Sequence, residues 1–122
     1  MEVAIVARYG ATRGGFYEQG YKVFNEAFQL FETLKQEGKL TSYEAFGFST
    51  GDVEVITGMV ILKGPEASIR DLPADPRIGD VISKATLTTS HFSMDFAVYG
   101  ETLMQRAALT EKISKQLHLV PA

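Results

Sequence analysis

The segment KLTSYEAFGFSTGDVEVITGMVILK, residues 39–63, contains two runs of alternating side chains on either side of Gly51-Asp52. A period of two is typical of β-strands, and Gly supplies the positive φ that a two-residue turn requires. The pattern therefore predicts a long β-hairpin in which Thr50 faces Val53. A loop of three to five residues with a shifted register is the alternative.

Both faces of this hairpin carry apolar side chains. Phe46 and Met59 share one face, whereas Val60 and Leu62 lie on the other. An antiparallel sheet with helices on one side normally exposes its other side to water. Two apolar faces therefore predict a second cover, and we expect it to be another copy of the same sheet.

The rest of the chain changes its period in an ordered way. Residues 2–9 are apolar on both faces, as in a central strand, and residues 16–34 repeat apolar side chains at helical spacing up to Gly38. Asp75 before Pro76 predicts the N-cap of a second helix.

A fourth strand is predicted over residues 92–98 and a further helix over 101–117. This order predicts an α+β fold in a single domain over residues 1–122: a ferredoxin-like βαββαβ unit with an antiparallel four-stranded sheet, helices on one face and an extra C-terminal helix.

Composition limits the classes of function. The 122 residues include no cysteine, which excludes a thiol nucleophile or a thiolate metal site. The net charge is −3 without a basic cluster, so we expect neither nucleic acid nor a membrane surface as a partner. Residues 1–5 lack the pattern of a signal peptide or a membrane span, and we predict a cytoplasmic protein.

We also expect no cofactor and no metal. The segment Gly10–Gly15 follows a strand, but it lacks the Lys-Ser/Thr ending of a P-loop and the spacing of a dinucleotide fingerprint. His91 and His118 do not stand at the spacing of metal ligands.

Turn and packing residues over roughly positions 37–104 carry a resemblance. They are Gly38-Lys39-Leu40, Ser42-Tyr43-Glu44, Gly51-Asp52, Gly58, Leu62-Lys63-Gly64, Leu72, Asp75, Phe92 and Gly100-Glu101. Together they resemble a group of small bacterial proteins of unassigned function, similar to the dimeric α+β-barrel proteins. The resemblance implies two ferredoxin-like subunits that join their sheets into a barrel, and it brings no catalytic residues with it.

The strand order suggests where a site would lie. With the first and third strands parallel and the other two opposite, Arg8, Glu44 and His91 gather at one end of the sheet. We predict Glu44 and His91 as catalytic residues. The predicted ligand-binding residues are Arg8, Tyr9, Arg13, Tyr17, Phe46 and Met59.

Each charged candidate also has a structural interpretation. Glu44 shares a face with Phe46 and Met59, where loss of solvent would suit it to proton transfer, or it is an exposed carboxylate. His91 is a general base or a surface group. Arg8 and Arg13 either hold an anion or form ion pairs, for example with Asp95 or Glu18.

Two functions follow, from different classes. The first is a homodimeric barrel that binds a small apolar or aromatic molecule. The alternative is a cofactor-independent monooxygenase or proton-transfer lyase with Glu44 or His91 as its base. The enzyme requires one of these two side chains to point into an enclosed cavity. Dimerisation as a function in itself is a third possibility.

Overall fold

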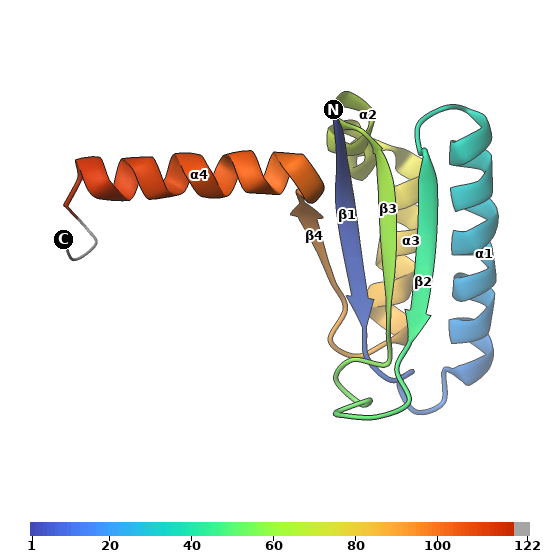
Figure 1. Cartoon of the computed structure of the whole chain (residues 1–122). Coiled ribbons are helices and arrows are strands. Elements are labelled where there is room, and N and C mark those ends of the chain that lie inside the picture. The colour runs from blue at the N-terminus through green and yellow to red at the C-terminus, as the bar shows by residue number, and fades with distance from the viewer. Residues whose placement is uncertain (119–122) are drawn as a thin grey trace.

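The computed structural model describes residues 1–118, in an order of elements that confirms the ferredoxin-like prediction. These are β1 (Glu2–Tyr9), α1 (Tyr17–Gln36), β2 (Ser42–Gly47), β3 (Gly58–Pro65), α2 (Glu66–Asp71), the 3-10 turn η1 (Leu72–Ala74), α3 (Pro76–Thr88), β4 (Ser93–Ala97) and α4 (Gly100–Gln116). The strands form one antiparallel sheet in the order β2-β3-β1-β4, with α1 and α3 on one face (Figure 1).

The strand directions differ from those used to locate the site. β1 is antiparallel to both β3 and β4, and β3 is antiparallel to β2. The first and third strands are therefore not parallel. The reason is the crossover through α1, which returns the chain to the sheet in the direction of β1, so that the following hairpin reverses β3.

The hairpin has a longer loop than the two-residue turn predicted for it. Thr57 donates its hydroxyl to the Val53 carbonyl at 2.6 Å, and the Ile56 amide donates to the Asp52 carbonyl at 2.9 Å. These local bonds take residues 48–57 out of the strands. Glu44 consequently faces Ile61 rather than Met59. Because this shift is two positions, each side chain keeps its predicted face.

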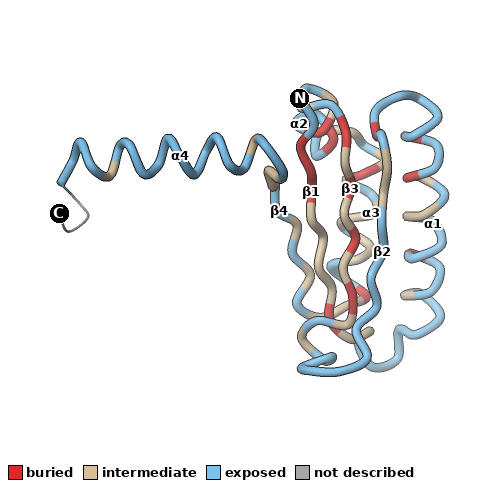
Figure 2. Tube along the Cα trace, viewed as in Figure 1, coloured by how far each residue is buried: buried red, intermediate tan, exposed pale blue. Residues whose placement is uncertain are grey.

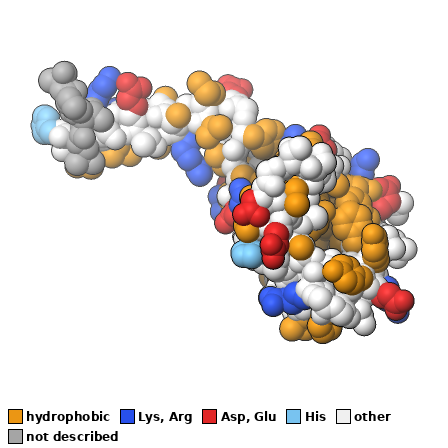
Figure 3. Space-filling model, turned by 90° about the horizontal axis from the view of Figure 1, so that it is seen from below, with side chains coloured by type: hydrophobic (Ala, Val, Ile, Leu, Met, Phe, Trp, Pro, Cys, Tyr) orange, Lys and Arg blue, Asp and Glu red, His pale blue; other side chains and the backbone are white. Residues whose placement is uncertain are grey.

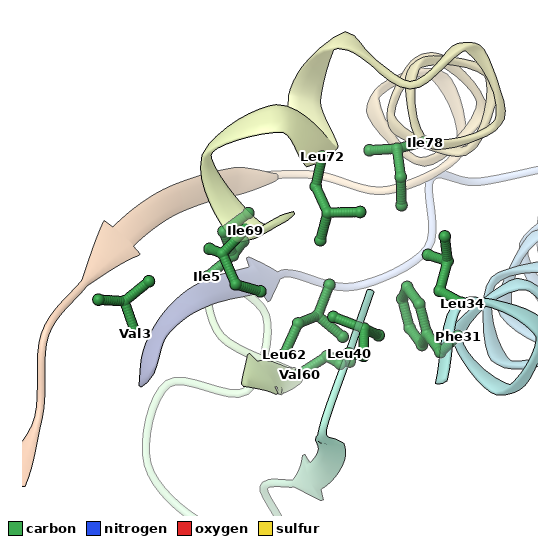
Figure 4. Close-up of a cluster of buried hydrophobic side chains, with 10 residues drawn as sticks. All are labelled: Val3, Ile5, Phe31, Leu34, Leu40, Val60, Leu62, Ile69, Leu72 and Ile78. Carbon is green, nitrogen blue, oxygen red and sulfur yellow. The ribbon is translucent and has the colours of Figure 1, made fainter. Parts of the chain in front are cut away.

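The core lies between the sheet and its helices. Val3, Ile5, Val60 and Leu62 alternate along the two central strands and point toward the helical layer, where Leu34 is fully buried (Figure 4). Figure 2 shows the same burial along β1 and β3. The face opposite the helices, here called the outer face, is not covered by any helix of the described chain.

Asp75 is the predicted N-cap of α3 and also connects that helix to α1. Its Oδ1 accepts a hydrogen bond from the Arg77 amide at 2.9 Å. The Arg77 guanidinium donates to both oxygens of Glu37, each at 2.9 Å, just beyond the end of α1. Hydrogen bonds from the Arg77 side chain and backbone hold the pKa of Asp75 well below its usual range. This network fixes the spacing of the two helices at one end of their layer.

α4 is the predicted C-terminal helix, but it does not join this layer. It projects away from the body of the molecule and is exposed along almost its whole length (Figures 1 and 2). None of its residues is buried. Among the described helices, none has the length and apolar character needed to cross a membrane.

Candidate cavity between the sheet and the helices

A cavity of about 300 Å³ lies between the covered face of the sheet and the helices α1 and α3. Its walls include the aromatic side chains of Tyr9, Phe24, Phe28, Phe31 and Phe92. Among the described residues that line it, none carries a charge. The cavity is therefore suited to an uncharged, largely apolar molecule.

Small residues leave this space open. Ala27 on α1, Ala85 on α3 and Ala7 on β1 all line the cavity from different sides. Larger side chains at these positions would fill the gap between the two layers, as side chains do in the core nearby. Tyr21 and Phe24 also line the cavity, and these residues are 74% and 41% exposed. The cavity therefore opens to solvent beside these two residues.

Tyr9 supplies a hydrogen-bonding group with no protein partner. No hydrogen bond joins its hydroxyl to any side chain or backbone group of the described chain. The ring packs edge-on against Phe24, with 6.3 Å between ring centroids, and the hydroxyl lies over Gly58, where a Cβ would collide with it. Burial raises the pKa of Tyr9. The phenol is thus protonated near neutral pH and has a free donor.

Threonine hydroxyls provide the complementary groups. Thr57, Thr88 and Thr89 line the cavity, and each donates its hydroxyl proton to a backbone carbonyl four residues earlier, at 2.6–2.8 Å. A hydroxyl has one proton, so these three groups offer only lone pairs to a bound molecule. The cavity combines a free phenol donor with hydroxyl acceptors.

The three loops that contain Gly10, Glu54 and Ser90 meet at the end of the cavity beyond β1. The Gly10 amide donates to the Ser90 carbonyl at 2.7 Å, and the Ala11 amide donates to the Glu54 carbonyl at 2.9 Å. A Cβ on Gly10 would lie 2.5 Å from the Glu54 oxygen and 2.6 Å from the Ser90 oxygen. Only glycine permits this approach, which fixes Thr12, Thr57 and Thr89 around the same space.

The structure brings one of the predicted ligand-binding residues, Tyr9, to the cavity. Arg13 and Tyr17 are exposed, and Arg13 donates through Nε to the Thr89 carbonyl at 3.0 Å. Phe46, Met59 and Arg8 form one cross-strand row on the outer face.

The two predicted catalytic residues lie elsewhere. Glu44 is exposed on the outer face opposite Ile61, midway along the edge strand β2 rather than at the end of the sheet near Arg8. His91 is exposed in the turn before β4 and has a φ of 56°. Arg8 binds Asp95 at 2.8 Å on the outer face, as its structural interpretation anticipated. The predicted cluster is correct in placing Arg8 and His91 at the same end of the sheet, because Arg8 pairs with Ser93 at the start of β4. It is wrong for Glu44, whose predicted place depended on the parallel arrangement.

Sequence reasoning missed most of the cavity. The threonines at positions 12, 57, 88 and 89 stand in loops and at a helix end, where such residues are common for local reasons. Ala27 and Ala85 are small residues on the sides of α1 and α3 that face the sheet, and their size was the signal in the sequence that could have indicated a cavity. In the part of the chain that the structure describes, no three His, Asp or Glu side chains gather as metal ligands.

Solved structures share this fold. A dimeric ferredoxin-like protein of unknown function from Thermobifida fusca matches with a TM-score of 0.63 and 11% identity, over 81% of this chain and 92% of its own. A similar dimeric protein of unknown function from Bacteroides fragilis matches with a TM-score of 0.58 and 12% identity, over 80% and 96%.

An oxygenase has the same architecture. SnoaB, a cofactor-independent oxygenase from Streptomyces nogalater, matches with a TM-score of 0.60 and 16% identity, over 84% of this chain and 96% of its own. No family model and no curated protein matches the sequence. These likenesses establish the ferredoxin-like fold, and the resemblance to dimeric proteins of that fold is confirmed.

Proposed function

We propose that this protein binds a small, uncharged aromatic molecule in the cavity between its sheet and helices. The observation that carries the proposal is the lining: aromatic rings on several sides, a free Tyr9 hydroxyl and no charged group among the described residues. An apolar cavity of about 150 Å³ can hold benzene. The volume of about 300 Å³ therefore has room for two fused rings.

A fluorescent naphthol tests this proposal. We expect 1-naphthol to bind the wild-type protein saturably, with its emission shifted by the apolar walls. Ala85→Phe and Ala27→Phe, which fill the cavity from its two helical sides, should each abolish binding. Ala67→Phe introduces the same ring at an exposed position of α2 and serves as the control.

One combination of results would reject the cavity as the binding site. If both filling variants melt cooperatively like the wild type and still bind 1-naphthol, the cavity is not the site. Two filling variants are used because overpacking destabilises some positions.

We further propose that two copies associate through their outer faces. The compared proteins from Thermobifida fusca and Bacteroides fragilis are described as dimeric. Val6, Met59 and Ile61 lie half-buried on the outer face without a helix above them. Ile61→Lys should lower the mass measured by light scattering toward that of one chain. A wild-type monomer at high micromolar concentration would exclude the dimer.

The alternative function is cofactor-independent oxygenation or proton-transfer chemistry. The fold of SnoaB favours it at the level of architecture. Its predicted bases, Glu44 and His91, are exposed in the single chain and neither lines the cavity, so this function requires a second copy to enclose one of them. Oxygen uptake in the presence of 1-naphthol tests this alternative, because oxygenation of the ring consumes O₂. Uptake that Glu44→Gln or His91→Gln abolishes would establish catalysis, whereas binding without uptake favours the binding function.

A further inference from the structure

The helix α4 leaves the body of the protein at a fixed point. The Tyr99 hydroxyl donates to Glu2 Oε1 at 2.9 Å, and the Lys63 ammonium lies 4.9 Å from the centre of the Tyr99 ring. Gly100 follows with a φ of +60°, a conformation that glycine adopts without strain. The direction in which α4 departs is therefore set by contacts of β1, β3 and residue 99.

From this point α4 extends beyond the reach of its own body. A helix of 17 residues is about 25 Å long, comparable to the diameter of a small domain. It has no extensive packing against any other described strand or helix. An isolated helix of this length is only marginally stable in water, because helices in proteins are held mainly by packing of an apolar side. α4 consequently needs a partner that the single chain does not supply.

One side of α4 carries most of its large apolar side chains. Leu109, Ile113 and Leu117 stand four residues apart and leave 56%, 43% and 60% of their surfaces exposed. Leu103 extends the same side toward the body, and Arg106 is a charged residue on it, whereas Lys112, Lys115 and Glu111 occupy other sides. Seen from below, exposed hydrophobic side chains appear both on the body and along this helix (Figure 3). We call Leu103, Leu109, Ile113 and Leu117 the apolar stripe.

We propose that α4 is an arm that packs its apolar stripe against a second copy of this chain, which returns the same contact. In a two-fold dimer each contact occurs twice, so both stripes are buried together. The root of the arm, Tyr99 with Lys63, borders the outer face that we propose as the dimer interface, and the arm thus continues that interface.

The structural comparisons agree with α4 being an addition to a shared dimeric fold. They span 92–96% of the compared chains but only 80–84% of this one. The residues from Gly100 onward amount to a similar remaining share, about a fifth of the chain. A second copy is favoured over a membrane surface because Glu111 stands among the lysines, whereas helices that lie on membranes are rich in basic residues.

The first experiment changes the apolar stripe in the full chain. Leu109→Lys and Ile113→Lys affect side chains that are exposed in one copy, so the fold of the body should not change. Loss of such an anchor typically weakens an interface by roughly tenfold or more, and we expect at least this increase in the dimer dissociation constant measured by sedimentation equilibrium. Met104→Lys, on the opposite side of the same helix and 68% exposed, is the matched control and should leave the constant unchanged.

The second experiment locates the contact. The chain has no cysteine, so Ile113→Cys creates one unique attachment point for a benzophenone maleimide. Illumination should produce a covalent dimer on a denaturing gel, and Met104→Cys treated in the same way should produce much less.

Three outcomes would contradict the proposal that α4 packs against a second copy. They are a wild-type monomer at high micromolar concentration, equal dissociation constants for wild type and both stripe variants, and a monomer that binds phosphatidylglycerol vesicles through α4. If Ile61→Lys breaks the dimer and the stripe variants do not, the association of outer faces stands and the arm is rejected. Neither result bears on 1-naphthol binding, which the cavity variants test separately.

Discussion

The two faces of the sheet differ although the same strands build both. On the covered face, Val60 and Leu62 are buried beneath the helices and hold the fold. On the outer face their neighbours Met59 and Ile61 are only half-buried, beside the exposed Arg8–Asp95 ion pair. Since successive side chains of a strand point in opposite directions, a single strand separates residues that stabilise the chain from residues free to meet a partner.

The largest expected effect compares two neighbours on β3. Leu62→Ala removes a side chain that is 3% exposed and should lower the free energy of unfolding by about 2–5 kcal/mol. Ile61→Ala should cost less in dilute protein, with a loss that grows with protein concentration if the proposed dimer buries this residue. Urea unfolding at two concentrations measures both. Equal, concentration-independent losses would contradict the assignment of separate roles to the two faces.

A smaller effect concerns the helical layer of the covered face. Asp75→Ala removes the N-cap of α3 and should cost about 0.5–2 kcal/mol, whereas Asp75→Asn retains an acceptor for the Arg77 amide and should cost less near neutral pH.

The pH dependence of the same site has a definite sign. Because folding lowers the pKa of Asp75, its ionised form stabilises the fold above the unfolded value of 3.8, and this contribution is lost as the pH falls through the lower folded value. The stability difference between wild type and Asp75→Asn should therefore shrink on acidification in thermal melts. A difference that is constant down to pH 2 would show that the charge of Asp75 has no role.

The smallest effect tests the Tyr9 hydroxyl of the cavity. Tyr9→Phe keeps the ring against Phe24 and removes only the hydroxyl, whose hydrogen bond is worth about 0.5–1.5 kcal/mol. Binding of 1-naphthol, measured by titration calorimetry, should weaken about 2–10-fold, while binding of naphthalene should not change. Tyr17→Phe, at an exposed position outside the cavity, is the control. Equal losses for both ligands would instead indicate a packing role for the hydroxyl.

Local patterns in the sequence were sufficient to predict the helices and strands, and to predict which face of the sheet each hairpin residue occupies. The spacing of apolar residues predicted α1, Asp75-Pro76 predicted the start of α3, and alternation assigned residues of the hairpin to the correct faces even though its register is displaced by two positions. The displacement arose because the side chain of Thr57 and nearby amides bond within the loop, an option that strand periodicity does not reveal.

The site required information that no local pattern holds. The grouping of Glu44 with Arg8 and His91 failed on one error in strand direction, since reversing the hairpin relative to β1 moves the start of β2 to the other end of the sheet, whereas Arg8 and the start of β4 do share one end. Thr12 and Thr89 lie far apart in the sequence, and they form an isolated bridge only because two loops meet beyond β1.

The sequence by itself determined the ferredoxin-like order, the two faces of the sheet and a C-terminal helix, because each depends on a period of two or of about 3.6 residues. The tertiary structure decided that Ala27 and Ala85 leave a cavity instead of closing the layer, and that α4 points away from the body. The spacing of layers and the direction of a helix after a glycine are set by contacts between distant segments, so they appear only in the folded chain.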